Sequence, residues 1–245
     1  MTGNPTFNQD TFSRYQAVPE SDAMTIQGTV NKTAILLLLM LASASFTWRL
    51  YMTGAGDGLS TWTFAGAIGG FVIGLVTSFK KQWSPVTAPI YAICEGLFIG
   101  GLSSILDARY PGIVVQAVML TFGTLAALLG AYKTGLIVAS ARFKRGIVAA
   151  TGGIMIVYFA TMILGLFHVP MPFITGGNPI SIVFSLVVVV IAALNLVIDF
   201  DFIEQGAACS APKYLEWYAA FGLLVTLVWL YIEILRLLAK LSRRR

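Results

Sequence analysis

The sequence predicts an all-α membrane protein, a polytopic bundle of seven transmembrane helices, and three observations support this. Of its 245 residues, 57% are hydrophobic and only 11% are charged, whereas roughly a quarter of the residues of a soluble domain are charged. The apolar residues gather in seven long stretches. The alternating pattern of a membrane β-barrel is absent, so each stretch must be a helix that satisfies its own backbone in lipid.

Each apolar stretch has about 20 residues, enough to cross a hydrocarbon core about 30 Å thick. The seven predicted spans are 33–52, 62–79, 85–106, 112–132, 146–167, 179–200 and 218–241. Interfacial residues support several of the ends: Trp48 and Tyr51 close the first span, and Lys80 and Lys81 stop the second. We therefore predict a polar N-terminal arm over 1–32, a transmembrane domain over 33–241 and a basic tail over 242–245. The arm has no signal-peptide pattern.

Glycines recur at helix-packing spacing in two of the spans. The second span has Gly66, Gly70 and Gly74, and the third has Gly96 and Gly100. Small residues let helix backbones approach closely in lipid, where no hydrophobic effect drives helices together. The spacing predicts close helix packing and says nothing about function.

Lysines and arginines in the loops indicate the orientation, because cytoplasmic loops are enriched in them. Nine lie on the side of the N-terminus: Arg14, Lys32, Lys80, Lys81, Lys133, Arg142, Lys144, Arg145 and Lys213. Seven lie on the other side: Arg49, Arg109, Arg236, Lys240, Arg243, Arg244 and Arg245. When the five C-terminal residues of the second group are left out, nine basic residues against two favour a cytoplasmic N-terminus. We expect a multi-pass protein of the bacterial inner membrane.

Four acidic residues fall inside or at the end of the predicted spans: Glu95, Asp199, Asp201 and Glu233. A charge at the centre of a membrane helix costs about 2.5–3.5 kcal/mol on insertion scales, so each of these acids needs a role or a partner. The functional interpretation is a carboxylate cluster that lines a polar path. Two nearby acids cannot both ionise cheaply, and Ca²⁺ favours several carboxylate oxygens, so protons and Ca²⁺ would compete for one site.

Structural interpretations stand beside the functional one. In these interpretations Glu95 is protonated and hydrogen-bonded to a neighbouring helix, and Asp201 is solvated at the interface. Arg236 follows Glu233 by three residues, a spacing that permits a local ion pair. Asp199 and Asp201 point apart on one helix, so a pair of acids that binds a metal ion must form between spans, from Asp199 and Glu233.

Enzymatic chemistry has few residues to use. The single histidine, His168, has no predictable nucleophile partner, and the glycine fingerprints of nucleotide sites are missing. Cys94 and Cys209 give no disulfide framework. We therefore expect no enzyme, no cofactor and no nucleic-acid partner; lipid, Ca²⁺ and H⁺ are the expected partners.

The last third of the chain carries a resemblance to a known family. Segment 195–205, followed by 216–238 with its Leu230-Tyr-Ile-Glu233 pattern, resembles the closing part of the Bax inhibitor-1 family, the transmembrane Bax-inhibitor-motif proteins. Segment 91–101 is similar to the third helix of bacterial members. The likeness extends from about residue 29 onward and suggests a divergent bacterial branch.

The resemblance implies a fold with a central seventh helix and a calcium leak controlled by an acid pair, here Asp199 and Glu233. It also implies a basic latch after the second helix, here Lys80 or Lys81. The second acid of the family is aspartate where this chain has Glu233, and Arg236 adds a further positive charge, so Arg236 joins the latch candidates.

Two functions remain open. One is a pH-sensitive, calcium-permeable leak channel gated by the carboxylate pair. The alternative is a membrane regulator that conducts nothing and binds a protease or another membrane protein.

Overall fold

The computed structural model describes residues Pro19, 22–167, Met171, Ile174, Gly176 and 178–243. Residues 1–18 of the predicted arm, His168, and Arg244 and Arg245 of the tail lie outside the described residues. The described chain is helical, with one isolated antiparallel bridge between Ala23 and Pro212.

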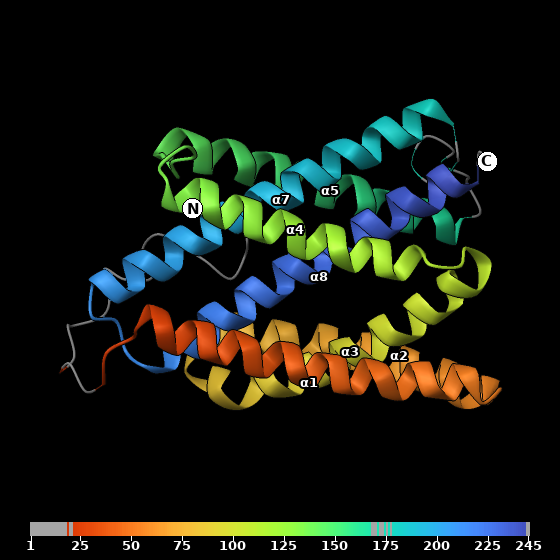
Figure 1. The fold of residues 1–245 in the computed structure, drawn as a ribbon, viewed down its shortest axis with the longest axis horizontal. Coiled ribbons are helices and arrows are strands. Elements are labelled where there is room, and N and C mark those ends of the chain that lie inside the picture. The colour runs from red at the N-terminus through yellow and green to blue at the C-terminus, as the bar shows by residue number, and fades with distance from the viewer. Residues whose placement is uncertain are drawn as a thin grey trace. The chain divides into compact units, whose positions relative to one another are not determined.

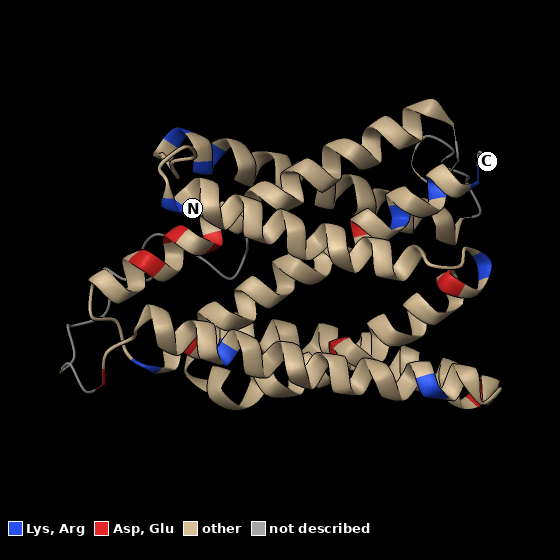
Figure 2. Ribbon diagram, in the orientation of Figure 1, with Lys and Arg blue, Asp and Glu red and all other residues tan. Residues whose placement is uncertain are grey.

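Within the described part of the chain, seven helices are long and apolar enough to cross a membrane (Figure 1). They are α1 (Ile26–Met52), α2 (Gly56–Phe79), α3 (Ser84–Arg109), α4 (Ile113–Lys133), α5 (Ala141–Leu166), α7 (Pro179–Ala208) and α8 (Tyr214–Ser242), with a short helix η3 (Lys81–Trp83) before α3. The predicted seven-helix membrane bundle is confirmed. Lysines and arginines lie mostly near the helix ends, and few charges fall in between (Figure 2).

Several helices extend beyond the apolar stretches that predicted them. The largest difference is at the end of α7, which continues to Ala208 and not only to residue 200. Helix α1 begins at Ile26 and not at residue 33, so the last residues of the predicted arm are helical. Thr25 caps this helix, because its hydroxyl accepts a hydrogen bond from the Gly28 N–H. A side-chain cap of this kind satisfies a free N–H at the helix start, and it lets polar residues continue the helix outside the apolar region.

The chain packs into two compact units. The α1–α3 unit comprises the described residues up to Pro111 together with Asp201–Val225. The α4–α5 unit comprises Gly112–Phe200 and the described residues from Thr226 onward. Helices α7 and α8 therefore each contribute one part to each unit.

In the α1–α3 unit, α3 packs against both α1 and α2. A Cβ on Gly96 or Gly100 would lie closer to the Met40 or Ala44 carbonyl of α1 than real Cβ contacts allow. A Cβ on Gly66 of α2 would lie 2.6 Å from the Cys94 carbonyl oxygen of α3. The glycine spacing therefore does create close helix contacts, as the sequence predicts.

Helices of the α4–α5 unit are joined by polar and aromatic contacts. The Asn195 side chain of α7 donates to the Thr151 hydroxyl of α5 at 2.9 Å. The rings of Tyr132 on α4 and Phe200 on α7 lie 5.9 Å apart.

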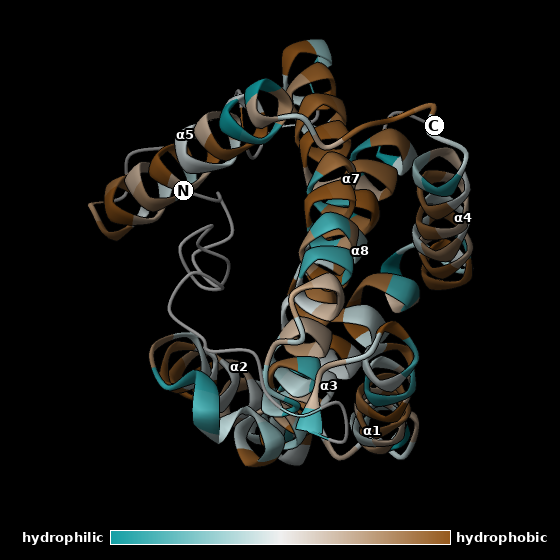
Figure 3. Ribbon diagram, turned by 90° about the vertical axis from the view of Figure 1, so that its left-hand side faces the viewer, coloured by the Kyte–Doolittle hydropathy of each residue, from teal (hydrophilic) through white to brown (hydrophobic). Residues whose placement is uncertain are grey.

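Helix α8 is the most buried of the spans, with 67% of its most apolar window buried against 11–44% for the others, which agrees with the expected central seventh helix. Apolar residues dominate these helices (Figure 3).

Candidate ion-gating site

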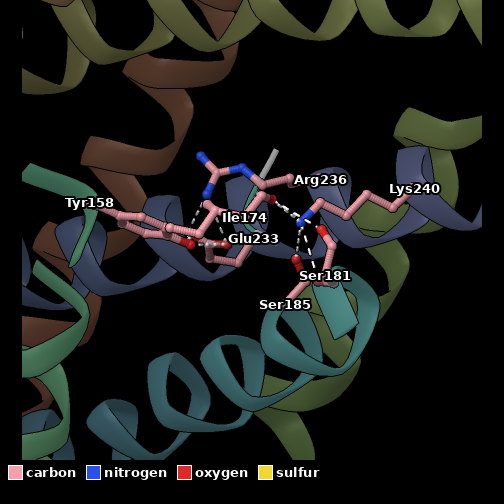
Figure 4. A network of polar contacts seen from close by, with 7 residues as sticks. All are labelled: Tyr158, Ile174, Ser181, Ser185, Glu233, Arg236 and Lys240. Carbon is pink, nitrogen blue, oxygen red and sulfur yellow. Dashed lines mark hydrogen bonds and ion pairs between the residues drawn. The ribbon is translucent and has the colours of Figure 1, made fainter. Parts of the chain in front are cut away.

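Glu233 is an acid of the α4–α5 unit that several polar contacts hold in place. It lies on α8, and its side chain is 1% exposed. Its carboxylate oxygens accept hydrogen bonds from the Tyr158 hydroxyl of α5 at 2.9 and 3.0 Å. They also accept bonds from Arg236 Nη1 at 3.1 and 3.2 Å (Figure 4). The local ion pair that the three-residue spacing permits is therefore present.

Tyr158 holds this arrangement from the side of α5. Its ring meets Phe184 of α7 edge-on, with the ring centroids 6.2 Å apart. The Arg236 guanidinium lies 5.0 Å from the centroid of the Tyr158 ring, a cation–π distance. Arg236 keeps 39% of its side chain exposed. Three helices thus fix one carboxylate, and its cation partner still reaches solvent or lipid.

One face of α8 continues from Glu233 through Arg236 to Lys240. Lys240 is 5% exposed. Its ammonium donates to the Ile174 carbonyl at 2.6 Å, to the Ser181 carbonyl at 3.2 Å and to the Ser185 hydroxyl at 2.7 Å. The network in Figure 4 therefore holds two cations and one acid. In this arrangement the Glu233 oxygens are occupied, and the nearby charge is positive.

Asp199 lies on α7 in the same unit and is 0% exposed. Helices α7 and α8 are antiparallel, and the contacts of Lys240 with Ser181 and Ser185 show which residues of the two helices lie at the same level. Glu233 precedes Lys240 by seven residues on α8. Asp199 follows Ser185 by 14 residues and Ser181 by 18 residues on α7. At 1.5 Å per residue, the two acids are offset by about 10–16 Å along the helices.

In this structure the Glu233 carboxylate accepts its hydrogen bonds from Tyr158 and Arg236. A common Ca²⁺ site needs both acids within one coordination shell, with oxygens about 2.3–2.6 Å from the ion. The offset would have to close for that to happen. The pairing of these two acids as a metal site stays a prediction.

The other two predicted acids belong to the α1–α3 unit. Glu95 on α3 is half-buried, and its Oε2 lies 2.6 Å from where a Cβ on Gly70 of α2 would be. The missing side chain at Gly70 makes room for this carboxyl group. Asp201 accepts a hydrogen bond from Gln205 Nε2 at 2.6 Å, within its own helix.

The predicted latch lysines follow α2. Lys80 is exposed at the end of that helix. Lys81 lies half-buried in η3, with its ammonium 5.2 Å from the centroid of the buried Tyr218 ring. Arg236, the third latch candidate, directly contacts the predicted gating acid Glu233.

Metal-binding clusters and disulfides do not occur in the described part of the chain. None of its His, Cys, Asp and Glu residues form a group of three or more that could hold a metal ion. Cys94 is a half-buried free thiol and Cys209 an exposed one.

The sequence analysis did not single out three polar residues that form hydrogen-bond networks in the structure: Tyr158, Lys240 and Glu216. Tyr158 had one usable signal, since a tyrosine hydroxyl inside an apolar helix normally needs a hydrogen-bond partner. Lys240 was counted with the C-terminal basic residues but is buried. Glu216 is 0% exposed and accepts hydrogen bonds from the backbone and side chain of Thr25 and from Lys32. Its partners are too distant in sequence to give a local signal.

The fold and the network define a multi-pass α-helical membrane protein that holds a carboxylate, an arginine and a lysine within its apolar helices. The profile of the Bax inhibitor 1 like family matches residues 4–243, and the chain belongs to this family. No curated protein and no solved structure matched the sequence.

Proposed function

We propose that the protein is a pH-sensitive, calcium-permeable leak pathway whose gating acid is Glu233, with Asp199 as the second acid. One observation carries this proposal: a carboxylate in α8, 1% exposed, is held by the partly exposed cation Arg236 and by Tyr158. We interpret the arrangement as the closed state, in which Arg236 acts as the latch.

The direction of the pH effect follows from the charges. Ionised Glu233 attracts Arg236, and this attraction is strengthened because the carboxylate itself is buried away from water. A proton on Glu233 removes the attraction and leaves Arg236 free to turn toward its exposed side. We therefore expect the flux of Ca²⁺ to rise as the pH falls, until the acids are too protonated to bind the ion.

The test uses the purified full-length protein in lipid vesicles, with Ca²⁺ uptake followed between pH 8 and pH 6. Glu233→Gln keeps the shape of the side chain but removes its charge, so we expect flux that no longer depends on pH. Asp57→Asn, at an exposed acid in the first turn of α2, is the matched control. A Glu233→Gln profile that coincides with the native profile would remove Glu233 from the gate.

A second candidate function rests on the surplus of positive charge around Glu233. Arg236 and Lys240 together outweigh one acid, and positive charge repels cations. This favours a regulator that conducts nothing and binds a membrane protease or another membrane partner. Ca²⁺ flux of the native protein no higher than that of empty vesicles at every pH would support this function and overturn the first.

We also propose that the protein lies in the bacterial inner membrane with its N-terminus in the cytoplasm. The structure takes Arg236 into an ion pair and Lys240 into the protein interior, so these two cations weigh less in the loop count. Labelling of a cysteine placed at exposed Lys133 or at exposed Arg49, with a reagent that cannot cross membranes, tests the orientation.

A further inference from the structure

Lys240 is a buried cation bound by neutral oxygen atoms. Two of its three acceptors are backbone carbonyl oxygens, of Ile174 and Ser181, and the third is the Ser185 hydroxyl. Among the described residues no carboxylate pairs with it. Burial of a charge is costly unless other groups replace its hydration, so these three oxygens must take the place of water around the ammonium.

The oxygens around Lys240 are oriented by contacts of their own. The Ser181 hydroxyl donates to the Ile174 carbonyl at 3.1 Å and to the Gly176 carbonyl at 2.8 Å. The Ser181 N–H donates to the Asn178 side chain at 2.8 Å, at the start of α7. Ser181 and Ser185 are 0% and 1% exposed. Contacts within this segment therefore help to hold the Ile174 and Ser181 carbonyl oxygens in place, independently of Lys240.

Carbonyl and hydroxyl oxygens that face one point form the kind of site that replaces the hydration shell of a monovalent cation in membrane proteins. Here the cation is the end of a side chain, as Figure 4 shows. Lys240 brings the charge from α8, while the oxygens come from the first turns of α7 and the segment before it. The contact thus joins the last helix to the start of the preceding one through a cation.

We propose that Ile174, Ser181 and Ser185 form a monovalent-cation site specific for a primary ammonium group, which the protein's own Lys240 occupies. The site belongs to the α4–α5 unit and is distinct from the carboxylate of Glu233. It does not depend on whether the protein conducts Ca²⁺. A chain without the Lys240 ammonium leaves an oriented set of oxygens that binds a free primary ammonium ion of the size of the missing side chain.

The experiment measures the thermal stability of purified full-length protein in detergent. Lys240→Ala removes a fragment equal in size to n-propylammonium, and we expect a lower Tm that rises again, with saturation, as n-propylammonium chloride is added. Tetramethylammonium chloride has the same charge but no N–H donor, and we expect no such rise. Lys133→Ala, at an exposed lysine in the last turn of α4, is the control for loss of a lysine.

Two further variants sharpen the test. Lys240→Met keeps much of the side-chain volume without the charge, and a Tm equal to that of the native protein would overturn the proposal. Adding Ser185→Ala to Lys240→Ala removes one oxygen, and we expect the propylammonium effect to weaken. Equal stabilisation by the two ammonium salts would also overturn the proposal, because it would show a general salt effect.

If Lys240→Ala does not fold, the single variant Ser185→Ala supplies the measurement. Acylation of the native protein by an amine-reactive ester, followed by mass spectrometry, should modify Lys133 much faster than Lys240. Ser185→Ala should raise the rate at Lys240 and leave the rate at Lys133 unchanged. An unchanged Lys240 rate, or one equal to that of Lys133 in the native protein, would show that Ser185 does not hold the ammonium.

Discussion

Thr25 and Glu216 are 191 residues apart in the sequence, yet the backbone N–H and the hydroxyl of Thr25 both donate to Glu216 Oε1, at 2.8 and 2.9 Å. Lys32 pairs with the other carboxylate oxygen and lies 5.6 Å from the centroid of the Trp217 ring. A carboxylate at a helix N-terminus is favourable because it faces the positive end of the helix dipole. Glu216 therefore fastens the start of α1 to the start of α8.

Glu216→Ala should destabilise the protein, because it leaves the donors of Thr25 and Lys32 without their acceptor. The expected loss is about 1–3 kcal/mol, the usual cost of an unsatisfied buried group. Asp22→Asn, at an exposed acid in the adjoining segment, is the control. The measurement is the Tm in detergent, and equal Tm values for both variants would show that the Glu216 contacts contribute nothing.

Gly100→Ala should weaken the contact between α3 and α1. The added Cβ would meet the Ala44 backbone, which cannot move aside like a flexible side chain. Gly123→Ala on α4 is the matched control, since nothing lies within 4 Å of its Cβ position. Alanine is favoured over glycine in a helix by about 1 kcal/mol, so the control should be unchanged or slightly more stable. A Gly100→Ala protein as stable as the control would contradict close packing here.

Tyr158→Phe should loosen the hold on Glu233 while keeping the ring that meets Phe184. Because the hydroxyl donates to both oxygens of Glu233, its loss leaves Arg236 as the remaining partner of Glu233. If Glu233 is the gating acid, Ca²⁺ flux into vesicles at pH 8 should exceed that of the native protein. Tyr132→Phe on α4 tests whether removal of any tyrosine hydroxyl has this effect. Native-like flux from Tyr158→Phe would argue that Arg236 alone sets the gate.

Thr151→Val should remove the hydrogen bond from Asn195 between α5 and α7. Such bonds within membranes average about 0.6 kcal/mol in double-mutant cycles. A cycle of Thr151→Val and Asn195→Leu, measured by unfolding in mixed micelles, gives the coupling between the two side chains. A coupling near zero would mean that the Ile191 carbonyl, the other acceptor of Asn195, suffices.

The sequence predicted the seven spans because each is continuous, apolar and long, and the glycine spacing predicted the close contacts of α3. It offered the Glu233–Arg236 pair as one of two interpretations, because three residues bring side chains to one face of a helix. The start of α1 was missed because the cap at Thr25 depends on Gly28 and on Glu216, which is remote in sequence.

The predicted spans do not show whether Asp199 and Glu233 lie at the same level of their helices. That requires counting the residues between each acid and the turn that joins α7 to α8. Only five residues, 209–213, separate α7 from α8, and a short antiparallel connection places residues equally far from the turn opposite one another. Counted in this way, Asp199 is much nearer the turn than Glu233. Hydropathy shows which acids are in the membrane, but the length of the turn decides which acids can meet.

Because α8 is shared by both units, the order of synthesis has a consequence for assembly. The ribosome makes this helix after the other six spans. It carries Glu216, which accepts hydrogen bonds from Thr25, Glu233, which Tyr158 holds, and Lys240, which α7 binds. Neither unit can reach its final packing while the C-terminal segment is still in the exit tunnel. Chains truncated before Tyr214 should therefore reach the bilayer without α8, remain incompletely packed and become substrates for quality-control proteases. Loss of only Arg244 and Arg245 should leave maturation intact.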